Sequence, residues 1–356
     1  MTNKMVDLRY SLNTPCDKLN SLSERDINSV VGFVFSYYRV IGFPFYRLSE
    51  REKIKTLEGL LSKEVDKLEL EGGRLQQVMA GLSLANSYHP HMWKTRCKKA
   101  KTPFEVFSDN VLFKKAIRKR IKYSDSKLSP FNIRKALKTF TGAQSVSNFR
   151  PTIAKYIYQK YCPAGGNVLD PCFGYSGRLL GAWASHIGRY EGCDPCVKTY
   201  EGSLACSHDL SLLTKKMNKE MLLPLYNCPE IVLHNMPFEE FKTESEYDLV
   251  FTSPPYYNLE KYSDEPTQSY MKYKSYYDWK TWFLKPLILI SQIVLRQNGY
   301  FVLNVGGEPL VADTIKIGTE VFEKEPEVLY MRLSKMIGSR NNKGFKEEPI
   351  LVWKKN

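Results

Sequence analysis

The residues with the clearest chemical potential form one short run, 252–256, with the sequence TSPPY. The run follows an apolar stretch, 247–252, whose composition is typical of a buried β-strand. Two consecutive prolines fix the backbone and remove two N–H donors, and the carbonyl groups of the run are left as acceptors. A hydroxyl, a rigid carbonyl and an aromatic ring in a row could hold a planar ring by its amino group. We expect the reaction centre to consist of Ser253, Pro254, Pro255 and Tyr256.

A second run, 170–177 (DPCFGYSG), has the composition of a ligand-binding turn between a strand and a helix. Its glycines, Gly174 and Gly177, would let the backbone approach a ligand where a side chain would clash. The helix that follows would present its N-terminus, which favours a negatively charged group. We therefore interpret this run, beginning with Asp170, as part of a nucleotide-like binding site.

Two further strand ends contribute residues to the same site. Asp194 ends the strand candidate 190–194, where a carboxylate can accept hydrogen bonds from both ribose hydroxyls of an adenosine. Asn235 and Met236 follow the strand candidate 231–234, at the position beside an adenine in such folds. Structural alternatives stay open, because Asp194 could cap a helix and Asn235 could form a turn.

These runs lie at the ends of strands that alternate with helices over the C-terminal part of the chain. Further strand candidates are 167–170 and 299–305, with 328–333 and 349–354 as a closing antiparallel pair. Helical patterns fill 176–186, 198–220 and 279–296. Strands that alternate with helices indicate a parallel sheet covered on both faces. The predicted fold class is α/β, with a Rossmann-like, mostly parallel sheet and an antiparallel last pair of strands.

The N-terminal part of the chain is mainly helical and strongly basic. The stretch 49–78 has apolar residues at helical spacing, interrupted by Gly72 and Gly73. Residues 94–138 contain fifteen Lys or Arg and three acidic residues, an excess typical of a phosphate-facing surface. One helix face would carry Lys115, Arg118, Lys119 and Lys122. We expect a helical domain over 1–140 that binds nucleic acid and recognises the target, and a second domain over 141–356; a merely solvated face is the alternative.

Composition narrows the class of protein. A net charge of +14 and a pI of about 9.2 suit a polyanionic partner. The eight cysteines show no disulfide framework and no complete set of zinc ligands, so we expect no metal. No apolar segment reaches the length of a membrane span, and residues 1–12 lack the core of a secretory signal. We expect a cytoplasmic protein, associated with the nucleoid if it is prokaryotic or phage-encoded.

Together these motifs resemble the S-adenosylmethionine-dependent amino-methyltransferases of DNA, which methylate N4 of cytosine or N6 of adenine. The tetrapeptide 253–256 matches their signature, and 170–177 is similar to their cofactor loop. The segment Phe149-Arg150-Pro151 matches an element that heads the helix before the first strand, and 348–354 (EPILVWK) is similar to their last strand. One departure is Ser176, which occupies the place of the family's second glycine, with Gly177 following it.

The resemblance implies S-adenosylmethionine as cofactor and methyl donor. The cofactor-binding residues that it implies are Phe149, Pro151, Asp170, Pro171, Phe173, Gly174, Gly177, Asp194, Asn235, Met236 and Ser253. Ser253 Oγ and the Pro254 carbonyl would accept the two N–H groups of a flipped base, and Tyr256 would stack on that base. The implied function is site-specific methylation of DNA by direct transfer.

The base and the polymer stay open. Serine at the first position of the tetrapeptide favours cytosine N4 in the resembling family, with adenine N6 as the alternative. DNA is the expected partner and RNA the alternative substrate, while a non-catalytic nucleic-acid-binding protein that retains the fold is a third interpretation. Carbon-5 methylation of cytosine would need a thiolate; Cys172 and Cys196 each follow a cofactor-side strand, so we do not expect this chemistry.

Overall fold

The computed structural model describes residues 12–220, 226–333 and 346–356. The chain divides into two compact units, Met1–Tyr46 with Pro90–Val146, and Arg47–His89 with Ser147–Asn356. The expected boundary at residue 140 lies close to the last of these crossings. The structure differs from the expectation over 47–89, which packs in the second unit and not with the basic helices.

The first unit is helical, and side-chain caps define its longer helices. Its elements are α1 (Cys16–Asn20), α2 (Glu24–Ile41), η3 (Pro90–Lys94), β3 (Arg96–Cys97), α5 (Pro103–Ser108), α6 (Asn110–Tyr123) and α7 (Pro130–Thr139). Ser23, Asp109 and Ser129 accept backbone N–H groups at the starts of α2, α6 and α7. The inward faces of these helices are apolar, and Val34 and Phe113 are fully buried between them.

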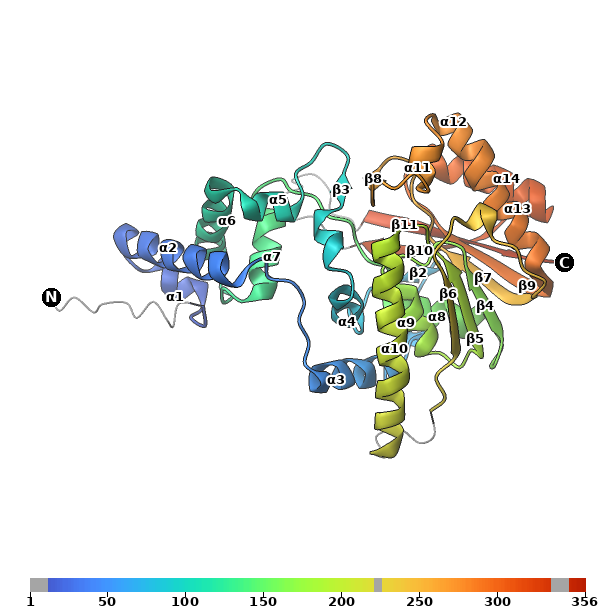
Figure 1. The fold of residues 1–356 in the computed structure, drawn as a ribbon, viewed down its shortest axis with the longest axis horizontal. Helices are drawn as coiled ribbons and strands as arrows, with labels where there is room; N and C mark the ends of the chain where they lie inside the picture. The colour runs from blue at the N-terminus through green and yellow to red at the C-terminus, as the bar shows by residue number, and fades with distance from the viewer. Residues whose placement is uncertain (1–11, 221–225, 334–345) are drawn as a thin grey trace. The chain divides into compact units, whose positions relative to one another are not determined.

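The second unit is built around a nine-stranded sheet with the order β1-β2-β10-β11-β9-β7-β4-β5-β6 (Figure 1). Its strands are β1 (Glu69–Leu70), β2 (Arg74–Leu75), β4 (Asn167–Asp170), β5 (Arg189–Cys193), β6 (Glu230–His234), β7 (Tyr247–Thr252), β9 (Leu295–Asn304), β10 (Glu327–Leu333) and β11 (Lys346–Lys354). The strands from β9 to β6 are parallel, and β11 pairs antiparallel with β9 and β10. The predicted Rossmann-like α/β fold with an antiparallel last pair is therefore confirmed.

Helices cover both faces of this sheet (Figure 1). One face carries α8 (Pro151–Tyr161), α9 (Gly177–Trp183) and α10 (Val197–Lys219), and the other carries α13 (Lys285–Val294) and α14 (Leu310–Phe322). The remaining elements are η4 (Phe238–Glu240), β8 (Glu260–Lys261), α11 (Ser269–Lys272), α12 (Tyr276–Trp279) and the π-helical turn η5 (Lys280–Leu284). Leu179 and Phe251 belong to the core on the first face, and Ile288 and Phe301 to the core on the second. No helix in the described ranges is long and apolar enough to cross a membrane.

The segment 47–89 is attached to the sheet by pairing and by capping. It forms α3 (Glu50–Leu61), η2 (Asp66–Leu68), the hairpin β1–β2 and α4 (Leu82–Ser87). Of the expected helical stretch 49–78, only 50–61 is α-helix, and Gly72 and Gly73 adopt positive φ in the turn of the hairpin. Strand β2 pairs with β10, and the buried Lys155 of α8 donates to the carbonyls of Leu60 (3.1 Å) and Leu61 (2.7 Å) at the end of α3.

Candidate active site

A cavity of about 310 Å³ lies in the second unit, at the carboxyl ends of β4, β5, β7 and β9. Open α/β sheets bind their ligands at this edge. The predicted site residues that line the cavity are Phe149, Pro171, Phe173, Gly174, Asp194, Ser253, Pro254, Pro255 and Tyr256. The structure therefore brings the two motifs together in one place, although they are separated in the sequence by the whole of β5, α10 and β6.

Five of the implied cofactor residues lie outside the cavity lining: Pro151, Asp170, Gly177, Asn235 and Met236. Pro151 is the first residue of α8, where a missing N–H leaves no helical hydrogen bond unmade. Gly177 begins α9 so close to the preceding segment that a Cβ would lie 2.2 Å from the Phe149 carbonyl oxygen. Met236 packs against the core, and Asn235 is exposed. Asn235 Nδ2 donates to the backbone carbonyl of Asp194 over 3.0 Å, so it contacts a lining residue from outside the cavity.

Asp170 is fully buried and forms its bonds with the protein itself. Arg178 Nε donates to its Oδ2 over 2.7 Å, Tyr190 Oη donates to the same oxygen over 2.7 Å, and Thr252 Oγ1 donates to Oδ1 over 2.8 Å. Burial acts to lower the pKa of Arg178, but the adjacent carboxylate of Asp170 raises it above its usual range. Asp170 thus holds the loop after β4 in place, where the sequence predicted a direct cofactor contact.

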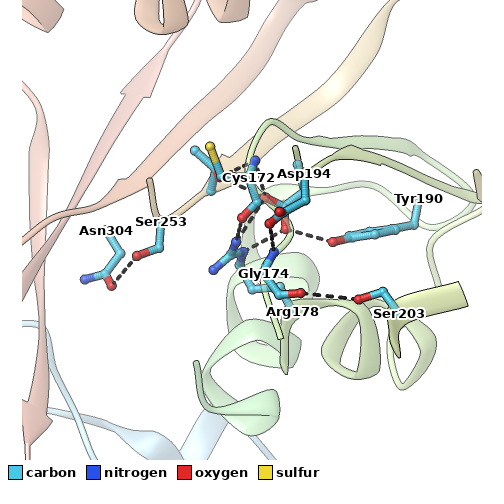
Figure 2. A network of polar contacts seen from close by, with 10 residues as sticks. Cys172, Gly174, Arg178, Tyr190, Asp194, Ser203, Ser253 and Asn304 are labelled. Carbon is cyan, nitrogen blue, oxygen red and sulfur yellow. Dashed lines mark hydrogen bonds and ion pairs between the residues drawn. The ribbon is translucent and has the colours of Figure 1, made fainter. Parts of the chain in front are cut away.

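Asp194 faces the cavity from the end of β5, where the sequence placed the ribose-binding carboxylate. Its Oδ2 accepts the backbone N–H of Gly174 over 3.1 Å, and its Oδ1 accepts that of Cys196 over 3.0 Å (Figure 2). Burial raises the pKa of Asp194 to about 7, against the two N–H groups, which favour the charged form. The carboxylate oxygens still have lone pairs for two hydroxyl groups.

Two of the residues predicted to form the reaction centre, Ser253 and Tyr256, bind to Asn304 at the end of β9. Ser253 Oγ donates to Asn304 Oδ1 over 3.2 Å (Figure 2). Tyr256 Oη donates to the same oxygen over 3.4 Å. Asn304 Nδ2 donates to the Pro349 carbonyl over 3.0 Å, which fixes the orientation of the amide. Burial raises the pKa of Tyr256 well above its usual value, so its hydroxyl stays neutral.

Two carboxyl side chains line the same part of the cavity, Glu260 on β8 and Glu348 on β11. The Tyr262 hydroxyl donates to Glu260. Burial raises the pKa of Glu260, its hydrogen bond to Tyr262 lowers it, and the charge of Glu348 raises it further. The reaction centre is therefore acidic, a property that no local sequence pattern indicates.

The cysteines near the cofactor loop are poor nucleophiles. Burial raises the pKa of the Cys172 thiol well above its usual value, and burial also raises that of Cys196. Only a thiolate attacks efficiently, so both side chains are unsuited to the covalent step of carbon-5 methylation. Within the described residues, no three His, Cys, Asp or Glu come together in a way that could hold a metal ion.

The predicted phosphate-binding residues lie on α6 in the first unit. Lys115 and Lys122 are exposed, and Lys119 is half-buried. Arg118 differs from them because its guanidinium pairs with Glu24 over 2.8 Å, which neutralises part of its charge. Two other arginines of the basic stretch, Arg120 and Arg134, are buried. Arg120 donates to the Asn132 side chain and Arg134 to the Pro44 carbonyl, within the unit.

The sequence matches no known family profile, and no curated protein is similar to it in sequence. Solved structures similar in fold include the following three. A methyltransferase from Pyrococcus furiosus shares 16% identity over 58% of this chain and 83% of its own, with a TM-score of 0.36. A protein from Listeria monocytogenes assigned to the class I S-adenosylmethionine-dependent methyltransferases shares 14% over 86% and 88% of the chains, with a TM-score of 0.41.

The third structure is the N-methyltransferase NodS from Bradyrhizobium japonicum, in complex with S-adenosyl-L-homocysteine. It shares 12% identity over 57% of this chain and 84% of its own, with a TM-score of 0.34. At such identities the similarity concerns the arrangement of strands and helices, and the chemistry of the site has to be argued from its own residues.

Proposed function

We propose that the protein transfers a methyl group from S-adenosylmethionine to the exocyclic amino group of a flipped base in DNA, with cytosine N4 as the preferred atom. The observation that carries this proposal is the orientation of Ser253 by Asn304. Because Asn304 Nδ2 is bonded to the Pro349 carbonyl, its Oδ1 faces the hydroxyl of Ser253. Ser253 gives its single proton to this oxygen, and its lone pairs are left to accept an N–H group.

An exocyclic amino group is a weak nucleophile because its lone pair is delocalised into the ring. Acceptance of its two N–H groups by Ser253 Oγ and the Pro254 carbonyl would turn the lone pair out of the ring plane. S-adenosylmethionine would supply the methyl group to this nitrogen, its sulfur would keep the electrons of the broken carbon–sulfur bond, and the nitrogen would release one proton to solvent. Positioning of this kind can supply about 7–11 kcal/mol in ideal cases.

The donor set of the cavity fits S-adenosylmethionine, which supplies an activated methyl group when bound. Asp194 offers acceptors to the ribose hydroxyls, and Phe238, a buried lining residue, offers an apolar wall to the adenine. Glu260 and Glu348 place two carboxyl groups in the cavity lining, and a cationic sulfonium beside them would favour their ionised forms. All of these groups line one cavity.

The exposed lysines of α6 support a polyanionic substrate. Lys115 and Lys122 point to solvent and could contact successive phosphates. Such contacts are independent of sequence and do not by themselves separate DNA from RNA. The choice of DNA and of cytosine rests on the tetrapeptide 253–256 and is decided by experiment.

Transfer of radiolabelled methyl from S-adenosylmethionine to duplex DNA, with RNA of the same sequence alongside, tests this proposal. We expect label in the DNA. Ser253→Ala should lose about 100-fold in rate because the acceptor for the amino group is gone, whereas Ser253→Thr keeps a hydroxyl and should retain more activity. Label in RNA alone would replace DNA as the substrate, and full activity of Ser253→Ala would overturn the proposed centre.

A further inference from the structure

A chain of buried hydrogen bonds connects the segment after α4 with the cofactor loop. His89 Nε2 lies 2.7 Å from Ser176 Oγ, and Ser176 Oγ lies 2.9 Å from Ser203 Oγ on α10. Ser203 Oγ donates to the Gly174 carbonyl over 3.3 Å (Figure 2). His89, Ser176 and Ser203 are all fully buried, so solvent does not compete for these bonds.

A second, parallel connection reaches the same loop from α4. Asn148 Nδ2 donates to Asn86 Oδ1 over 3.0 Å and to the Tyr175 carbonyl over 2.6 Å. The Gly174 carbonyl is therefore bonded by Ser203 and the Tyr175 carbonyl by Asn148. Both donors connect in turn to the segment 82–89. The Gly174 N–H points the other way, to Asp194, so the position of this turn also sets the position of the ribose-binding carboxylate.

The backbone of Ser176 explains why such support is needed. Its φ is +61° and its ψ is 7°, a left-handed conformation that glycine adopts at little cost and serine does not. This is the position where the resembling family has its second glycine. Here a serine takes the conformation and uses its hydroxyl to join His89 to Ser203.

We propose that His89 is a positioning residue for the cofactor loop, acting through Ser176 and Ser203 on the turn at Gly174. The inference rests on the proposed function in one respect, because the ligand of the loop is taken to be S-adenosylmethionine. It extends that function to a residue outside the cavity lining, from a segment that the sequence assigned to another domain.

The order of donors in this chain follows from counting protons. Ser203 has one hydroxyl proton and gives it to the Gly174 carbonyl. With this assignment, Ser176 gives its proton to Ser203 and His89 donates from Nε2 to Ser176. The imidazole therefore carries a proton on Nε2. A glutamine at position 89 could donate in the same direction, whereas a leucine could not.

Calorimetric binding of S-adenosylhomocysteine to the full chain tests the positioning role. His89→Gln should bind within about twofold of the natural protein, and His89→Leu should bind roughly three- to tenfold more weakly. Ser176→Gly relieves the backbone strain but interrupts the chain, so we expect it to bind as weakly as His89→Leu. In the methyl-transfer assay both should raise KM for S-adenosylmethionine and leave kcat at saturation within about twofold.

The two failures can be told apart. If the natural protein binds neither S-adenosylmethionine nor S-adenosylhomocysteine, the proposed function fails. If it binds them and both His89→Leu and Ser176→Gly bind equally well, the positioning role fails. Nitrogen-15 NMR of the five histidines needs no ligand: the signal lost in His89→Gln should show a protonated Nε2. An unprotonated Nε2 would overturn the donor order, even if His89→Leu or Ser176→Gly misfolds.

Discussion

The two ends of the cavity are built in opposite ways. At the cofactor end, hydrogen bonds within the protein fix the loop after β4. Asp170 accepts hydrogen bonds from Arg178, Tyr190 and Thr252. Both the N–H and the carbonyl of Gly174 are also hydrogen-bonded. At the target end, Ser253 has a single hydroxyl proton, which it donates to Asn304. A rigid loop fits a ligand of constant shape, and a reaction centre must keep acceptors for an incoming amino group. Substitutions at the first end should therefore affect folding and affinity, and those at the second end should affect rate.

The largest effect is expected from Arg178→Met. This change leaves the carboxylate of Asp170 buried without its cationic partner, since the two side chains are 5% and 0% exposed. Loss of one partner of a buried pair costs about 3–5 kcal/mol of the free energy of unfolding. Denaturant unfolding of the variant measures this loss. The double variant Asp170→Asn, Arg178→Met is the matched control and should recover part of it; a loss below about 1 kcal/mol in the single variant would contradict the role given to the pair.

A smaller effect, confined to rate, is expected from Asn304→Ala. Without the Oδ1 acceptor the Ser253 hydroxyl can rotate, and it presents its proton instead of a lone pair for part of the time. Methyl transfer should fall roughly tenfold in kcat, because one net hydrogen bond of orientation is lost. The affinity for S-adenosylmethionine should stay within about twofold. A lower affinity for S-adenosylmethionine with unchanged kcat would show that Asn304 belongs to the cofactor end.

The pH dependence of cofactor binding separates the two ends in another way. The ribose hydroxyls require the ionised form of Asp194, whose pKa in the unliganded protein is raised by burial to about 7. Affinity should therefore be constant above pH 7 and fall by up to about tenfold for each pH unit below it. Calorimetry between pH 5.5 and 8.5 measures this slope. Asp194→Asn cannot titrate and should bind weakly at every pH; a natural protein with flat affinity across this range would remove Asp194 from the ribose site.

The smallest effects concern single cations on α6. Each phosphate contact on duplex DNA adds about 0.9 to the slope of log affinity against log salt concentration. Lys115→Gln or Lys122→Gln should flatten the slope by up to about that amount. Arg118→Gln should change it less, because Glu24 already pairs with the guanidinium. Equal slopes for all three variants and the natural protein would indicate that DNA binds elsewhere.

Local patterns were sufficient to predict the sheet and the residues that lie at its strand ends. The apolar runs that form β4 and β7 are short and bounded by polar turns, and 253–256 follow β7 directly, as Asp194 follows β5. By contrast, Asn304 meets Ser253 across 51 residues of chain, and His89 meets Ser176 across 87. A single polar residue far away in the sequence leaves no periodic signal.

The segment 47–89 shows the same limit at the level of whole elements. Its helical spacing around Leu57 and Leu60 is genuine, since both residues are buried in α3. The pattern does not indicate what this segment packs against. In the structure β2 pairs with β10 of the sheet, and Lys155 of α8 donates to the Leu61 carbonyl. The doublet Gly72-Gly73 was the one local sign of a turn, and its positive φ angles confirm that sign.

The most direct test of the account is the identity of the methylated nucleoside. DNA incubated with the protein and S-adenosylmethionine is digested to nucleosides, which are separated by liquid chromatography against standards and analysed by mass spectrometry, with Ser253→Ala as the control. We expect N4-methyldeoxycytidine as the product, nearly absent when Ser253→Ala replaces the natural protein. N6-methyldeoxyadenosine would keep the amino-group mechanism and change the base. A 5-methyldeoxycytidine product, or an equal yield of methylated nucleoside from Ser253→Ala, would contradict the claim that Ser253 holds an exocyclic amino group for direct transfer.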